Sequence, residues 1–230
     1  MTALRTAWTR ALDVVFPPRC VGCGAFGAFI CDPCVASSQR ADGVRCLRCG
    51  SPVREEACQR CYRHPPQIAG TRSAFTYAGV PRSAVLSLKF AGVSAIAPRM
   101  GELMAPTFVA WHPPVDAIVP VPLGGLRKRT RGYNQSELLA LEVGRLTGLP
   151  VETEVIRRNR STSPQTEQPD EVARRLNVQG AFGPDRRRPR GSLLLIDDVT
   201  TTGATLDACA RVLLSAGAAR VYALTFTRED

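Results

Sequence analysis

Eight of the nine cysteines lie within the first 61 residues, where they form four pairs of identical spacing. Two residues separate the cysteines of each pair, so that two thiolates of one tight turn can reach the same tetrahedral metal ion. Two such pairs supply all four ligands of a closed site. The eight residues are Cys20, Cys23, Cys31, Cys34, Cys46, Cys49, Cys58 and Cys61. We therefore predict two structural Zn²⁺ sites in this segment.

The spacing leaves two groupings of these cysteines open. In the simpler, sequential grouping the first four cysteines bind one ion and the last four bind another; an interleaved grouping mixes the two halves. An iron–sulfur cluster is the main rival to zinc, because it also takes four thiolates. A disulfide framework needs an oxidising compartment, and residues 2–16 are broken by charges and lack the apolar core of an export signal. The ninth cysteine, Cys209, is expected to be a small core residue.

A second stretch, Ser192–Thr205, combines residue types that suggest ligand binding. Residues 193–196 form an apolar run typical of a central strand that is covered on both faces. The carboxylates Asp197 and Asp198 follow, and a threonine-rich turn then leads into the helical spacing of Ala204–Ala216. Ligands of open α/β sheets bind at the carboxyl ends of the strands. This order of elements therefore predicts a binding site at the turn.

The turn and the two acids would recognise different parts of one ligand. A helix N-terminus offers free amide groups to a phosphate, and threonine hydroxyls add donors. Adjacent carboxylates repel a phosphate, so their natural partners are ribose hydroxyls or a Mg²⁺ ion that bridges those hydroxyls. Together they specify a ribose 5-phosphate. The alternative is purely structural: Asp197 and Asp198 cap a turn, and Thr202 caps the helix.

The remaining composition indicates a folded chain with a basic surface. Of 230 residues, 44% are apolar, and 30 basic against 20 acidic residues give a formal charge of +10, which favours phosphate-bearing partners. We expect an N-terminal amphipathic helix over 1–16, a double zinc-ribbon module over 17–64 and a larger domain over 65–230. Strand-like and helix-like segments alternate in the larger domain, which predicts an α/β fold with a mostly parallel sheet flanked by helices. No apolar run is long enough to span a membrane, so a cytoplasmic location is expected.

Two further segments are candidates for contacts with a diphosphate and for closure over the ligand. The strand expected at residues 115–119 is followed by a cationic loop that contains Arg127 and Arg131. A helix with Asn134 as its N-cap comes next, and Leu139, Val143 and Leu146 would form its buried face. Guanidinium groups in the loop could hold a diphosphate with several donors at once, although a solvated basic turn explains them equally well. The polar, proline-containing segment from Arg160 to Arg174 would be a loop that closes over the substrate.

The motif Ile196-Asp-Asp-Val-Thr-Thr-Thr-Gly-Ala-Thr205 resembles the binding loop of type I phosphoribosyltransferases, which use 5-phosphoribosyl 1-diphosphate (PRPP). Only Thr200 departs, since an aliphatic residue is commoner there. Residues 119–123 resemble the pyrophosphate-loop region, and residues 131–135 follow it. The segments 160–166 and 174–182 resemble a pattern of the ComF family. Members of that family join an N-terminal zinc module to a phosphoribosyltransferase domain. The resemblance covers nearly the whole chain, from Phe16 to Phe226.

This resemblance implies a role for each matching residue. The acid pair Asp197 and Asp198 would be catalytic. The groups that would bind PRPP are Thr200, Thr201, Thr202, Gly203, Ala204 and Thr205. Those that would bind the diphosphate are Val121, Pro122, Leu123, Arg127 and Arg131, and the flexible loop would use Arg160, Thr162, Gln165 and Arg174.

The family resemblance also implies a function in bacterial DNA uptake. The first hypothesis is a Mg²⁺-dependent phosphoribosyltransferase whose acceptor is open. The second is a binding module without turnover that senses PRPP, or that docks single-stranded DNA or competence proteins such as a helicase or DNA-processing factors. Aromatic residues, which stack on unpaired bases, make up only 6% of the chain, so direct DNA binding is weakly supported.

Overall fold

The computed structural model describes residues 17–53, 58–160, 178 and 180–229, and the helix expected over residues 1–16 lies outside this range. A four-stranded parallel sheet, in the order β1-β6-β5-β2, forms its centre. Its strands are β1 (Gly70–Thr76), β6 (Arg220–Arg228), β5 (Ser192–Thr200) and β2 (Ala117–Pro120). A separate antiparallel hairpin consists of β3 (Ile156–Arg158) and β4 (Phe182–Pro184). The predicted α/β fold with a mostly parallel sheet is confirmed.

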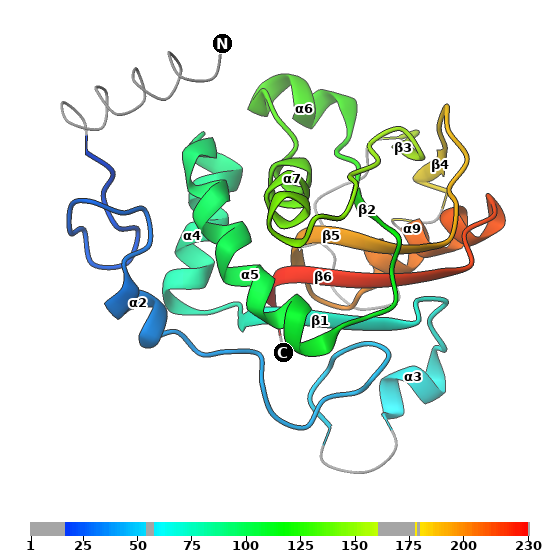
Figure 1. The fold of residues 1–230 in the computed structure, drawn as a ribbon, viewed down its shortest axis with the longest axis horizontal. Helices are drawn as coiled ribbons and strands as arrows, with labels where there is room; N and C mark the ends of the chain where they lie inside the picture. The colour runs from blue at the N-terminus through cyan, green and yellow to red at the C-terminus, as the bar shows by residue number, and fades with distance from the viewer. Residues whose placement is uncertain (1–16, 54–57, 161–177, 179, 230) are drawn as a thin grey trace.

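Helices cover both faces of this sheet, with α4, α5 and α7 on one side and α9 on the other (Figure 1). The helices of the sheet region are α4 (Gly79–Phe90), η1 (Ser94–Ile96), α5 (Ala97–Trp111), α6 (Gly125–Arg131), α7 (Gln135–Thr147) and α9 (Ala204–Ser215). Along β5, Leu194 and Ile196 face α4, α5 and α7, while Leu193 and Leu195 face α9. This alternation explains the unbroken apolar run, because a strand covered on both faces buries every side chain.

The cysteine-rich segment precedes the sheet and wraps around its lower edge in Figure 1. Its only described helices are the short α2 (Asp32–Ala36) and α3 (Gln59–Arg63). Ile30 is buried in the same core as α4 and α5, so the first part of the segment packs directly on those helices. Arg63 is the last residue of α3.

Local signals set several element boundaries as expected. The side chain of Asn134 accepts a hydrogen bond from the amide of Ser136 at 3.2 Å, so Asn134 is the N-cap of α7. Cys209 is fully buried on α9, as predicted. The cationic segment expected to be a loop is in fact the short helix α6, and β5 continues through both aspartates to Thr200. Among the described residues, no helix has the length and apolarity needed to cross a bilayer.

Candidate functional site

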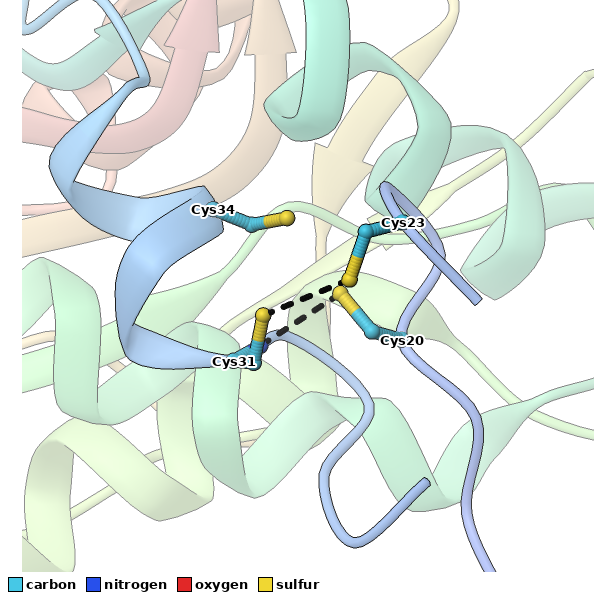
Figure 2. A group of neighbouring side chains, drawn as sticks. All are labelled: Cys20, Cys23, Cys31 and Cys34. Atoms are coloured by element: carbon cyan, nitrogen blue, oxygen red, sulfur yellow. Dashed lines mark hydrogen bonds between the residues drawn. The ribbon is translucent and has the colours of Figure 1, made fainter. Parts of the chain in front are cut away.

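The structure groups the eight N-terminal cysteines sequentially, which was the simpler of the two predicted arrangements. Cys20, Cys23, Cys31 and Cys34 form the first cluster, and Cys46, Cys49, Cys58 and Cys61 form the second. In each cluster the four sulfur atoms lie within 4.8 Å of one another. Figure 2 shows the four side chains of the first cluster converging on one point.

The sulfur spacing fits zinc. In a tetrahedral site with Zn–S bonds of about 2.3 Å, neighbouring sulfurs are about 3.8 Å apart. The Sγ atoms of Cys23 and Cys31 are 3.6 Å apart, those of Cys46 and Cys61 3.6 Å, and those of Cys49 and Cys58 3.7 Å. A disulfide would need about 2.05 Å. Both clusters therefore have the ligands and spacing of closed, structural Zn²⁺ sites.

The thiols of each cluster also destabilise one another's charged forms. Burial raises the pKa of Cys20, but backbone hydrogen bonds from Cys23, Cys31 and Gly22 outweigh it and lower that pKa to about 6. Interactions with Cys31 and with Cys20 raise the pKa of Cys34 to about 12. Ionisation of one thiol thus opposes ionisation of the next. A divalent cation removes this opposition, because every coordinating thiol is then deprotonated.

The predicted acid pair lies near the carboxyl end of β5, and both side chains are buried. Oδ1 of Asp197 accepts hydrogen bonds from the hydroxyl of Ser136 at 2.8 Å and from the amide of Asp198 at 2.9 Å. Ser136 lies in the first turn of α7, whose position is set by the Asn134 cap. The helix cap therefore brings a hydroxyl from α7 to a carboxylate of β5.

Asp198 forms an ion pair with Lys89, a residue that lies far from it in the sequence. Nζ of Lys89, near the end of α4, lies 2.9 Å from Oδ2 of Asp198. The contact is an ion pair without hydrogen-bond geometry, so Oδ2 retains unused hydrogen-bonding capacity among the described residues. The hydroxyl of Tyr133 donates to the carbonyl of Leu88 at 2.5 Å and holds the end of α4 against the start of α7. Lys89 is thereby fixed beside the acid pair.

Burial and the neighbouring charge of Asp198 raise the pKa of Asp197 to about 7. Lys89, the hydroxyl of Ser136 and the amide of Asp198 act in the opposite direction by favouring the carboxylate. Two adjacent buried carboxylates cannot both carry full charge without opposition. The pair therefore holds a proton that a cation or a hydroxyl-bearing ligand can displace near neutral pH.

The threonine-rich turn joins this acid pair to α9. Gly203 has a φ of +79°, and a Cβ atom built there would meet nothing within 4 Å, so the backbone at the helix N-terminus lies open. The hydroxyl oxygen of Thr202 accepts from the amide of Ala204 at 3.3 Å, but the N-cap residue of α9 is Gly203 and not Thr202, which the structural alternative had as the cap. Oγ1 of Thr201 is buried and has no hydrogen-bond partner among the described residues. A buried hydroxyl without a partner is unusual in a folded protein, and a ligand bound beside it would supply the missing hydrogen bond.

Several arginines surround the acids. Burial lowers the pKa of Arg131, and the negative charge of Asp198 acts in the opposite direction. Its guanidinium donates to Oε1 of Gln135 at 2.6 Å and lies over the ring of Phe90. Burial also lowers the pKa of Arg158 in β3; Arg127 acts in the same direction, and Asp197 opposes it. The charges of the acids thus act on Arg131 and Arg158, and Arg127 acts on both of these arginines.

The other predicted contacts are less fully described. The amide of Val121 donates to Ile196 and its carbonyl accepts from Asn134, so its backbone groups are already used. Pro122 and Leu123 are half-buried beside it, and their contact with a diphosphate stays a prediction. In the proposed closing loop, Arg160 is described, whereas Thr162, Gln165 and Arg174 lie outside the described residues.

Three residues of the site were not found from the sequence: Lys89, Ser136 and Arg158. Lys89 is separated from Asp198 by more than a hundred residues, and no local pattern joins them. Ser136 carried a usable signal, since it follows the Asn134 cap by two residues and a capped helix start points toward the sheet edge. Arg158 ends a strand of only three residues, which is too short for a periodicity to be read.

Comparisons with known proteins agree with this organisation. Residues 11–63 match the family described as a double zinc ribbon domain. The chain is 32% identical over 200 residues to the DNA utilization protein YhgH of Escherichia coli (strain K12), covering 84% of this chain and 87% of that protein. It is 30% identical over 210 residues to the competence protein ComFC of Bacillus subtilis (strain 168), covering 87% and 84%.

Among solved structures, the chain is similar to a glutamine phosphoribosylpyrophosphate amidotransferase from B. subtilis, complexed with ADP and GMP. The TM-score is 0.42 and the sequence identity 19%, over 62% of this chain and 30% of that one. The chain therefore spans less than a third of that larger enzyme.

Proposed function

This chain belongs to the ComF family of competence-associated proteins, and we propose that it binds PRPP and transfers the ribosyl phosphate to an acceptor. The observation that carries the proposal is the orphaned, buried hydroxyl of Thr201, which lies between a buried acid pair and the N-terminus of α9. The amides of the turn and this hydroxyl would hold the 5-phosphate. Asp197 and Asp198 would hold the ribose hydroxyls.

The acid pair also fits Mg²⁺ by the chemistry of its donors. Two carboxylates and the hydroxyl of Ser136 supply oxygen ligands, and Oδ2 of Asp198 has unused capacity. Bound with PRPP, the ion would neutralise charge on the diphosphate. Lys89 already provides one positive charge beside Asp198, so the carboxylate is compensated before any ligand arrives.

In the proposed reaction, the bond between C1′ and the diphosphate oxygen breaks, and its electron pair leaves with the diphosphate. A nucleophilic atom of the acceptor forms the new bond to C1′ and loses its proton to solvent. Positive charge grows on the ribose ring during this step, and the carboxylates of Asp197 and Asp198 lie where they would stabilise it. Arg127, Arg131 and Arg158 would stabilise the departing diphosphate.

Diphosphate release tests this proposal. The protein would be incubated with PRPP and Mg²⁺ in the presence of candidate bases, ammonia or nucleic acid, and PRPP binding would be measured in parallel by calorimetry. Release that disappears in the double variant D197N/D198N supports the transferase. Binding without release under every condition supports the alternative, a PRPP sensor without turnover. Absence of binding contradicts both.

A second role, in holding single-stranded DNA or a competence protein, is favoured by exposed aromatic residues on the cysteine clusters. Phe26 is 61% exposed, and the guanidinium of Arg19 lies 4.1 Å from its ring centre. Tyr62, on the second cluster, is 86% exposed beside Arg63. Such rings can stack on unpaired bases while nearby arginines contact the phosphates. Loss of oligonucleotide binding in F26A/Y62A, with PRPP affinity unchanged, would support this role.

A further inference from the structure

The second cysteine cluster lies against the end of β6, the neighbour of the strand that leads into the threonine-rich turn. Arg228, in β6, is 1% exposed, and its guanidinium donates to the carbonyl of Cys49 at 3.1 Å and to the hydroxyl of Ser51 at 3.0 Å. Both acceptors belong to one tight turn of the cluster. A fully buried arginine needs such partners, since an unpaired buried charge is costly.

The backbone of Arg228 also pairs with the strand that ends at the threonine-rich turn. Arg228 pairs with Thr200 in the register of β6 and β5, and the amide of Glu229 donates to the carbonyl of Thr200 at 2.9 Å. Thr200 is the last residue of β5, immediately before the turn. The side chain of Arg228 thus binds the cluster while its main chain aligns the strand that carries the turn.

A second arginine reaches the turn directly. The guanidinium of Arg60, on α3, donates to the hydroxyl of Ser51 at 3.1 Å and to the carbonyl of Thr201 at 3.5 Å. Ser51 therefore accepts from both arginines and is the shared point of the network. The cluster and the turn also line one cavity together, with Cys61 and Arg60 on one side and Thr202 and Gly203 on the other.

Gly50 allows the second cluster to lie close to β1 and to Arg228. Its φ is +70°, and a Cβ atom there would lie 2.7 Å from the carbonyl oxygen of Thr71 and 3.0 Å from Nη1 of Arg228. Any larger residue would push the cluster away from the sheet edge and from Arg228.

The first cluster is attached differently. Arg99 of α5 donates to the carbonyl of Ile30 at 3.3 Å and forms an ion pair with Asp32. Gly22 packs against Val80 of α4, where a Cβ atom would lie 2.6 Å from a methyl carbon. These contacts fix the first cluster to helices rather than to the turn.

We propose that the second cysteine cluster is part of the phosphate site, with Ser51, Arg60 and Arg228 acting as positioning residues that hold residues 200–205 in their ligand-binding conformation. This inference rests on the proposed function. It assigns the two metal clusters unequal roles: the second shapes the site, and the first stabilises the helical side of the molecule.

The test uses S51A and R60M, with R99M as the matched control at the first cluster and S51T as the conservative variant. Amide hydrogen exchange of residues 200–206 would be measured without ligand, and PRPP affinity with Mg²⁺ by calorimetry. We expect S51A and R60M to retain about two zinc ions per chain. We also expect faster exchange in the turn and PRPP binding weakened by about tenfold to a hundredfold, since small displacements of a binding group have large effects. S51T should restore both properties, and R99M should change neither.

Unchanged exchange in S51A and R60M would overturn the inference, as would an equal effect of R99M. If the wild-type protein fails to bind PRPP, the proposed function is wrong, and the exchange measurement still decides whether the second cluster positions the turn. The two failures are therefore distinguishable.

Discussion

The cysteine clusters and the acid pair both crowd negatively charged groups together, but they resolve the conflict differently. In the clusters the cysteines act on one another; interactions with Cys31 and with Cys20 are the largest causes that raise the pKa of the Cys34 thiol. At the acid pair, Asp198 faces the ammonium of Lys89 at 2.9 Å. A built-in side chain thus supplies the cation at one place, whereas a metal ion would supply it at the other.

This difference predicts that the metal of the clusters stays bound, whereas a second cation at the acid pair exchanges. A site closed by four thiolates is part of the fold, since the segment around it buries few apolar side chains of its own. A site that is already compensated by a lysine can gain or lose a second cation without unfolding. We therefore expect zinc to be structural in the clusters and Mg²⁺ to enter the acid pair only with its ligand.

Removal of zinc by a chelator should have the largest effect. Structural zinc contributes about 10–16 kcal/mol in zinc-finger peptides near pH 7, so the cysteine-rich segment should unfold. Elemental analysis before treatment should give about two zinc ions per chain, and thermal unfolding should follow the loss. Iron with visible absorbance, or an unchanged melting temperature after metal removal, would show that zinc is not structural in the clusters.

The double variant D197N/D198N should abolish PRPP binding but not folding. Hydrogen bonds to charged groups are each worth about 1.5–3 kcal/mol, so the loss of two carboxylates predicts at least about a hundredfold weaker binding. Circular dichroism and calorimetry measure the two properties separately. E142Q, which alters only the surface ion pair with Arg145, is the control. Wild-type affinity in the double variant would remove the ribose assignment.

Replacement of Lys89 by methionine should leave the negative charge of Asp198 without its counterion. Asp198 would stay buried without its cation, and we expect about 1–3 kcal/mol lower stability, less than for a fully buried pair because Lys89 is 23% exposed. Added Mg²⁺ should then raise the melting temperature more in K89M than in the wild type. R145M is the control, with an expected change below about 1 kcal/mol. Equal stability of K89M and wild type would refute the counterion role.

The smallest expected effect is the pH dependence that Asp197 contributes. Its pKa is about 7 in the folded protein and about 3.9 when unfolded, so the folded state binds the extra proton between these values. Stability from this group is therefore fully present below about pH 4 and is lost as the pH rises through about 7. PRPP affinity should change in the opposite direction. The melting temperature should depend less on pH in D197N than in the wild type across this range. Equal pH dependence in the two proteins would contradict the raised pKa of Asp197.

Features encoded by neighbouring residues were predictable from the sequence. The paired cysteines, the apolar strand before Asp197 and the Asn134 cap each lie within a few positions of the residues that define them, and the structure has all three. The predicted buried face of α7 was only partly right. Leu139 and Val143 are fully buried, but Leu146, in the last turn of α7, is 40% exposed.

Contacts that depend on topology were not predictable. Lys89 and Asp198 meet because α4 ends at the same sheet edge as β5, and nothing in either local sequence encodes that meeting. The same holds for Arg228 and Ser51, which are joined across 177 positions. The cationic segment around Arg127 was expected to be irregular but forms α6, which ends at Gly132 with a left-handed backbone.

The strand order has a consequence for synthesis of the chain on the ribosome. β6 comes last among the described strands, yet it lies between β1 and β5. Since translation proceeds from the N-terminus, β1 cannot pair with β6, its neighbour among the described strands, until residues 220–228 have emerged. The cysteine-rich segment is made first and can capture its metals during that delay, so the earliest ordered part of the nascent protein would be metal-bound rather than sheet-like.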